Sequence, residues 1–288
     1  CAGRRGGTHS PGRAAHPVED LDTAFALGRA LVRYDALAWI ATDAVVATDI
    51  DTSRLRGWLV SPGSGTEGEI VLLGELDDGA ISVVASVRCD LAEGPGSCVV
   101  APDFVPRPLS DQEATMRRAI DTAGSDRFFF GTQPKYNHVI VPGAPYGVDA
   151  GWIVYFFAAT TESGVVPLGR HYRFDVSADG DRVLARRTSH RSDIISRPQV
   201  PEGAELAAIA SNSLYDPHPS EFLIHDAIIW GVALSLVACD GSLWTIDGAK
   251  ITQLEPSRSP RDCIDPWTDP EAEPPTITTT AQPRRSRR

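Results

Sequence analysis

Apolar residues recur at two different periods along the chain, and these periods predict its helices and strands. From Val18 to Ala47 they fall every three or four residues, at Ala24, Leu27, Leu31, Tyr34, Ala38, Ala41 and Val45. This is the spacing of one face of an amphipathic α-helix. A shorter helix is predicted from Ser110 to Gly124, because Ser110-Asp-Gln-Glu113 is a capping box and glycine commonly ends a helix.

The central stretch alternates polar and apolar residues one by one, as a β-strand does. Residues 169–176 place three polar side chains on one face and three apolar ones on the other: His171, Arg173 and Asp175 against Tyr172, Phe174 and Val176. Asp179-Gly180 follows and predicts a two-residue type I′ hairpin loop. Such a loop would set Val176 opposite Val183 and Phe174 opposite Ala185.

Four Asp-Gly pairs separate neighbouring strand-like runs and indicate hairpins: Asp78-Gly79, Asp179-Gly180, Asp240-Gly241 and Asp247-Gly248. Repeated hairpins predict antiparallel pairing rather than helical crossovers. The fold class we predict is α+β, a predominantly antiparallel twisted sheet packed by the long N-terminal helix and the shorter one. Residues 221–230 are interpreted as a strand, with a helix after Asp216-Pro-His-Pro-Ser as the alternative.

The two ends differ in composition from the middle. Residues 1–17 are rich in Gly, Pro, Ser and Arg and are predicted to be a flexible tether, and 265–288 a disordered tail. Residues 18–264 form a single α+β domain in this interpretation, with 192–203 as the candidate boundary between two lobes. The formal net charge of −11 disfavours nucleic-acid binding, and no apolar run reaches the ~20 residues that span a bilayer.

The cysteines point to an oxidising compartment. Cys89, Cys98, Cys239 and Cys263 are an even set, and the favoured pairs are Cys89 with Cys98 and Cys239 with Cys263. Four separate buried thiols are the alternative. The sequence starts at Cys1, as a processed bacterial lipoprotein does. We therefore expect lipid attachment at Cys1 and a location in the cell envelope, periplasmic or on the outer face; the alternative is a truncated sequence that starts at a cysteine by chance.

Candidate chemistry is sparse. His138 and His171 flank the central strands, and with Arg173 they could line a cleft, histidine as acid or base and arginine as an anion clamp. The competing interpretation is that the polar row on this strand is a solvated face. His218, Glu221 and His225 would align on a helix as a metal-binding face, but the strand assignment and the prolines around His218 argue against a metal.

The Gly63–Gly68 segment matches GxGxxG, but a strand follows it where phosphate binding needs a helix. It is interpreted as a hairpin loop, and no cofactor is expected. The phrases Asn137-His-Val-Ile-Val-Pro142, Val154-Tyr155 and Gly169-Arg-His171-Tyr172-Arg173 resemble a set of uncharacterised exported bacterial proteins. In that set a glycine is expected where Arg170 stands. The resemblance implies no particular activity.

These observations favour a non-catalytic, exported domain, either lipid-anchored at Cys1 or secreted, that binds a protein partner or small ligand through its sheet. The membrane is contacted only through that anchor. The alternative is a hydrolase that uses His171, Arg173 and His138 in a cleft beside the central strands. No GxSxG, SxxK or HExxH motif supports the second hypothesis.

Overall fold

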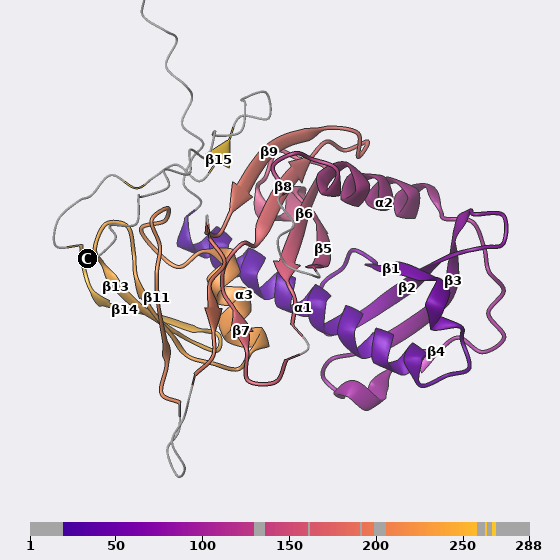
Figure 1. Cartoon of the computed structure of the whole chain (residues 1–288), viewed down its shortest axis with the longest axis horizontal. Helices are drawn as coiled ribbons and strands as arrows, with labels where there is room; N and C mark the ends of the chain where they lie inside the picture. The colour runs from indigo at the N-terminus through magenta and orange to yellow at the C-terminus, as the bar shows by residue number, and fades with distance from the viewer. Residues whose placement is uncertain are drawn as a thin grey trace, which may run out of the picture.

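The computed structural model describes residues 20–129, 136–160, 162–190, 192–198, 206–257, 263 and 267–268. Within these ranges the chain has the predicted α+β fold, with helices α1, α2 and α3 packed on several mainly antiparallel sheets (Figure 1). Short 3₁₀ turns occur at Thr52–Arg54, Pro95–Ser97 and Ala144–Tyr146. The predicted tether and Cys1 lie outside the described residues, as does part of the candidate lobe boundary. So does the predicted disordered tail, 265–288, except for Trp267–Thr268, which form strand β15 instead.

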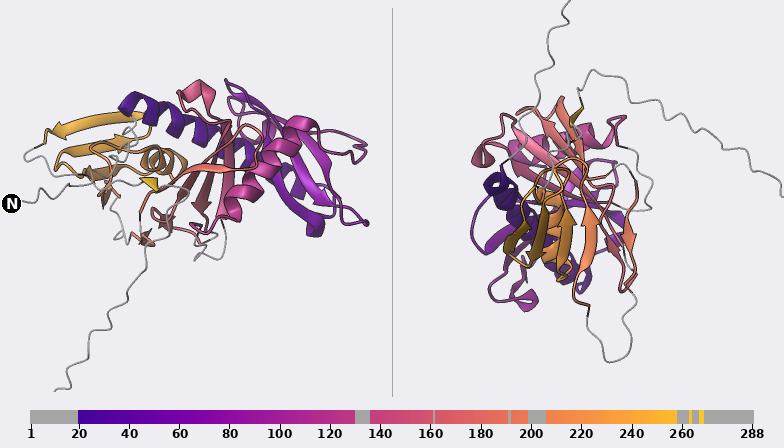
Figure 2. Two further views of the ribbon diagram at one scale, coloured as in Figure 1. Left: turned by 90° about the horizontal axis from the view of Figure 1, so that it is seen from above. Right: turned by 90° about the vertical axis from the view of Figure 1, so that its left-hand side faces the viewer.

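Helix α1, Leu21–Val46, is the predicted long N-terminal helix and runs along the length of the molecule (Figures 1 and 2). The Asp20 carboxylate caps it by accepting a hydrogen bond from the Thr23 N–H at 2.8 Å. Its apolar stripe packs against α3, the central sheet and the β1–β4 sheet. A single helix therefore joins the β1–β4 sheet, the central sheet and α3.

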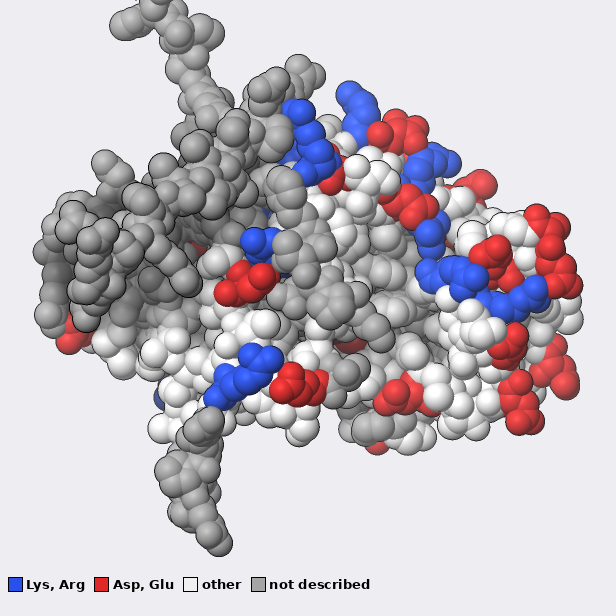
Figure 3. Space-filling view, in the orientation of Figure 1, with Lys and Arg blue, Asp and Glu red and all other residues white. Residues whose placement is uncertain are grey.

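The first sheet has the order β1-β2-β3-β4, and each neighbouring pair of strands is antiparallel. Its strands are β1 Leu55–Val60, β2 Glu67–Glu75, β3 Ile81–Asp90 and β4 Val99–Val100. The Cys89–Cys98 disulfide joins β3 to the start of β4. In the space-filling view, charges of both signs alternate over this end of the molecule (Figure 3). Arg54 pairs with Asp77 and Arg56 with Glu75 there, so opposite charges are interspersed rather than grouped by sign.

The central sheet has the order β15-β9-β8-β6-β5. Its strands are β5 Tyr136–Pro142, β6 Trp152–Ala158, β8 Tyr172–Val176, β9 Val183–Thr188 and β15 Trp267–Thr268. Helix α2, Asp111–Gly124, has both hydrogen bonds of the predicted capping box and covers one face of the sheet. Helices α1 and α3 cover the other face. The sheet is thus buried on both sides.

The β8–β9 hairpin differs from the prediction. Val176 does oppose Val183, but a bulge at Leu184 then sets Asp175 opposite Ala185 and Phe174 opposite Arg186. The loop is not type I′, because Gly180 adopts a positive φ of 81° and Asp179 does not. The turn is docked on α2 instead: the Thr122 hydroxyl donates to the Gly180 carbonyl at 2.8 Å. Tertiary contact decided the turn type.

The C-terminal sheet has the order β11-β12-β13-β14, formed by Ile209–Asn212, Leu234–Val237, Leu243–Asp247 and Lys250–Glu255. Residues Glu221–Ile229 form helix α3, so the strand prediction for 221–230 was wrong and the helical alternative was right. Because α3 crosses over the sheet, β11 and β12 are parallel. The hairpins at Asp240-Gly241 and Asp247-Gly248 are antiparallel as predicted.

Two smaller features complete the fold. Strands β7, Val166–Pro167, and β10, Ile195–Ser196, form a two-stranded ribbon. A second disulfide joins Cys239 to Cys263, so both pairs are those that the sequence favoured. Disulfides form and persist outside the reducing cytoplasm, so the protein is expected in an oxidising compartment. No helix among the described residues is both long and apolar enough to cross a membrane.

Candidate functional site

The central sheet separates two of the predicted site residues. Along β5, His138 opposes Phe156, which opposes Tyr172 on β8, so all three lie on the face covered by α2. His171 precedes Tyr172 by one residue and faces α3, where its ring lies 6.1 Å from that of Phe222. Because side chains alternate between faces, His138 and His171 do not share a cleft.

His138 has a local role instead. Its Nε2 lies 3.0 Å from the Trp58 carbonyl oxygen, and its ring stacks on the Trp58 indole with centroids 4.7 Å apart. Burial lowers the pKa of His138, which the Trp58 contact only partly offsets. A neutral, stacked imidazole is a packing element that fixes the plane of Trp58.

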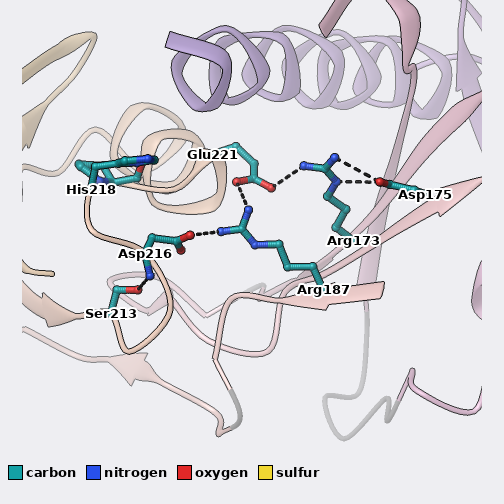
Figure 4. A network of polar contacts seen from close by, with 8 residues as sticks. Arg173, Asp175, Arg187, Ser213, Asp216, His218 and Glu221 are labelled. Atoms are coloured by element: carbon teal, nitrogen blue, oxygen red, sulfur yellow. Dashed lines mark hydrogen bonds and ion pairs between the residues drawn. The ribbon is translucent and has the colours of Figure 1, made fainter. Parts of the chain in front are cut away.

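Arg173 belongs to a buried ion-pair network rather than to a cleft (Figure 4). Its Nε donates to Asp175 at 2.9 Å, and its Nη1 to Glu221 at the start of α3 at 3.3 Å. Arg187 on β9 pairs with the other carboxylate oxygen of Glu221, with its Nη1 3.3 Å from Oε2. Its Nη2 donates to Asp216 at 2.6 Å. The alternative of a solvated polar face on β8 is wrong, since His171, Arg173 and Asp175 are all buried.

The bulge at Leu184 explains why this network forms. It advances β9 by one residue, so that Arg187 rather than Arg186 opposes Arg173 and faces α3. Burial opposes ionisation of Glu221, but Arg187 and Arg173 outweigh it, and the pKa of Glu221 is lowered. For Asp216 burial dominates and its pKa is raised. The network attaches α3 to the central sheet.

A second buried chain of polar groups links His171 to α1. The Ala158 N–H donates to His171 Nδ1 at 3.1 Å, so the ring proton sits on Nε2, which is 3.1 Å from Asp226 Oδ2. The other Asp226 oxygen lies 3.1 Å from His225 Nδ1, and His225 Nε2 lies 3.3 Å from Asp35 Oδ2 on α1. We call Asp35, His225, Asp226 and His171 the polar relay.

The protonation states of the relay follow from these contacts. Burial lowers the pKa of His225, but the hydrogen bonds and charges of Asp226 and Asp35 outweigh it and raise that pKa from 6.5 to about 9. His225 is therefore an imidazolium at neutral pH, with both N–H groups donating. Burial would raise the pKa of Asp226, yet His171 and His225 hold it below its usual range. Only Asp35, 14% exposed, reaches the solvent edge.

The relay forms one wall of a cleft of about 590 Å³. Its lining comes from α1, from α3 and the Trp230 that ends it, from strands β1, β5 and β6, and from residues just after β6. Besides the relay, the lining includes three indoles and several small polar side chains: Trp39, Trp58, Trp230, Thr42, Asn137 and Thr160. A second hollow, of about 580 Å³ along β2 and β3, is lined by surface acids such as Glu67 and Glu93 and lacks buried aromatic walls. The cleft at the relay is the better candidate site.

The other candidate motifs do not assemble a site. His218 lies before α3 with its Nδ1 3.0 Å from the Pro219 carbonyl, while Glu221 and His225 belong to separate networks. Within the described ranges, no group of three or more His, Cys, Asp or Glu is placed to hold a metal ion. The Gly63–Gly68 loop leads into strand β2, as predicted.

Sequence reasoning missed Asp35 and Asp226 as site residues. The signal was present: Asp35 lies four residues after Leu31 and three before Ala38, beside the apolar stripe of α1. Asp226 interrupts the apolar run of α3 in the same way. Arg170, which stands where the resemblance called for glycine, adopts a left-handed φ of 56°.

The fold and cleft together define a disulfide-bonded α+β protein with one aromatic, carboxylate-bearing cleft as its candidate site. Compared with protein-family models, curated proteins and solved structures, the chain matches none of them. The residues of the cleft are therefore the basis for assigning a function.

Proposed function

We propose that this protein is a non-catalytic small-ligand-binding domain of an oxidising compartment, with the ligand held in the cleft between α1 and α3. The observation that carries the proposal is the contrast between the walls of the cleft. A rigid, hydrogen-bonded relay forms one wall, and the indoles of Trp39, Trp58 and Trp230 contribute apolar surface. Such a combination of apolar surface and few fixed polar groups is typical of ligand sites.

The relay is better suited to binding than to proton transfer. Both ring nitrogens of His171 are engaged, one by a backbone N–H and one by Asp226, and both nitrogens of His225 are held by carboxylates. A general base needs a lone pair directed at the substrate. The hydrolase alternative has less support, because Arg173 and His138 lie outside the cleft lining.

A pair of tryptophan substitutions tests the proposal. Thr42→Trp would fill the cleft, whereas Val46→Trp, one turn further along α1 at a 58% exposed position, would not. Small-molecule libraries would be screened by thermal shift and by the quenching of tryptophan fluorescence. Compounds that bind in the cleft should bind wild type and Val46→Trp with equal affinity and should not bind Thr42→Trp. Hits that bind all three proteins equally would place the ligand elsewhere.

The location in the cell envelope and the lipid anchor at Cys1 belong to the same proposal. The two disulfides support the location only, because disulfides form and persist in an oxidising compartment. Mass spectrometry of the protein from its native host tests the anchor: a diacylglyceryl-type mass on the Cys1 peptide is expected. An unmodified Cys1 peptide would remove the anchor and leave a secreted protein.

A further inference from the structure

The cleft has a negative electrostatic character that selects among ligands. In the relay, the Asp35 and Asp226 carboxylates carry two negative charges and the His225 imidazolium carries one positive charge, while His171 Nδ1 accepts a hydrogen bond from the Ala158 N–H. The sum is one negative charge. Among the described residues of the cleft lining, none is a lysine or an arginine. An anionic ligand would therefore meet repulsion and no compensating donor pair.

The negative charge is directed into the cleft by Asp35. Its Oδ2 is 3.3 Å from His225, and no further hydrogen bond of the carboxylate to a described residue is present. A carboxylate that is 14% exposed has lost most of its hydration, so a donor that approaches its second oxygen gains more than it would at an open surface. Glu162 also lines the cleft, but it is exposed and paired with Arg197 at 3.3 Å.

Aromatic surface accompanies this carboxylate. Trp39, one turn after Asp35 on α1, is 59% exposed, which is unusual for so large an apolar side chain. Trp58 is held in a fixed plane by its stacking on His138 at an interplanar angle of 12°. Indole faces attract cations more strongly than the other aromatic rings do. A carboxylate beside indoles is the combination that recognises substituted ammonium groups.

We propose that the ligand of the cleft is an organic cation, a protonated or quaternary amine whose nitrogen lies between the Asp35 carboxylate and the tryptophan rings. This inference rests on the proposed ligand-binding function and specifies its ligand class. The volume of about 590 Å³ exceeds that of a bare ammonium group, so the remainder of the ligand has room for an apolar or hydroxylated body.

The test compares matched probes by isothermal titration calorimetry and ligand-observed NMR. The cationic probes are tetramethylammonium, choline and benzyltrimethylammonium. Each cation whose neutral analogue is soluble is paired with that analogue, in which a carbon atom replaces the nitrogen. Pivalate is the anionic probe. The cations should bind wild-type protein and the neutral and anionic probes should not. If neutral probes bind as well as cations, the cleft binds ligands but the cation inference is wrong. If no probe binds and the library screen gives no cleft hit, both proposals fail.

Variants locate the binding on the cleft. Asp35→Asn keeps an oxygen that accepts from His225 but removes the charge, and should weaken cation binding at least about tenfold. Asp43→Asn makes the same change on the exposed side of α1, outside the lining, and should leave the affinity unchanged. Trp39→Leu should weaken binding roughly two- to fivefold. Equal affinities of wild type and Asp35→Asn would overturn the assignment.

Discussion

Glu221→Gln tests whether the buried ion-pair network stabilises the contact between α3 and the central sheet. Glu221 is fully buried and lies between Arg173 and Arg187, each at 3.3 Å. Glutamine has nearly the same shape, so the substitution removes charge with little loss of packing. Two buried guanidinium groups then lose a shared counter-charge, and such a loss typically costs 3–5 kcal/mol.

The remaining ion pairs place the expected loss of stability at the lower end of this range. Arg173 retains Asp175 at 2.9 Å and Arg187 retains Asp216 at 2.6 Å, so neither arginine is left without an acid. We therefore expect about 3 kcal/mol of destabilisation at neutral pH, the lower end of the range. Because the pKa of Glu221 is lowered, its contribution is present above its ordinary value of 4.5 and is lost as the pH falls. The difference between variant and wild type should narrow in acid.

Urea unfolding is the suitable assay, since guanidinium salts would screen the charges. The matched control is Glu75→Gln, which breaks the exposed Arg56–Glu75 pair at 2.9 Å and should cost less than about 1 kcal/mol. Equal m-values are needed for the comparison. A Glu221→Gln variant within about 1 kcal/mol of wild type would refute the view that the network holds α3 in place.

Three further predictions concern other parts of the fold. The pKa of His225 is about 9 in the folded protein, against 6.5 for an ordinary histidine, so its stabilisation is complete below pH 6.5 and is lost as the pH rises through 9. The wild-type free energy of unfolding should therefore fall by on the order of 3 kcal/mol over that range. The variant His225→Gln should show a flatter dependence of this free energy on pH. Gly28→Ala should destabilise by about 1–3 kcal/mol in urea unfolding, because its Cβ would lie 2.6 Å from Ile224 Cγ2 where α1 meets α3. Replacing Cys89 and Cys98 by serine should cost about 2–3 kcal/mol, and thiol titration of the wild type under native, non-reducing conditions should detect neither of these cysteines.

Each of these three predictions would be contradicted by a specific result. A pH profile of His225→Gln as steep as that of wild type would show that another group causes the slope. An unchanged Gly28→Ala protein would mean that the two helices separate at little cost. Two reactive thiols from Cys89 and Cys98 in the oxidised protein would contradict the disulfide.

The sequence by itself determined the elements whose signals are local. The long helix, the capping box from Ser110 to Glu113 and the antiparallel hairpins depend on periodicity, side-chain capping and the positive φ that glycine accepts. The alternation of His171, Arg173 and Asp175 with apolar neighbours likewise fixed which side chains share a face. These properties require only the adjacent residues.

Tertiary structure decided whatever depended on distant partners. The run at 221–230 places its polar residues, Glu221, His225 and Asp226, without a clear helical or strand period, and they become buried where the helix packs against α1 and the central sheet. The buried polar row on β8 is stable because Arg173 and Arg187 meet Glu221, and that meeting depends on the bulge in β9. Asp35 and His225 are 190 residues apart in the chain, so no local pattern could have placed them together at the cleft. The site exists because α1 and α3 pack side by side.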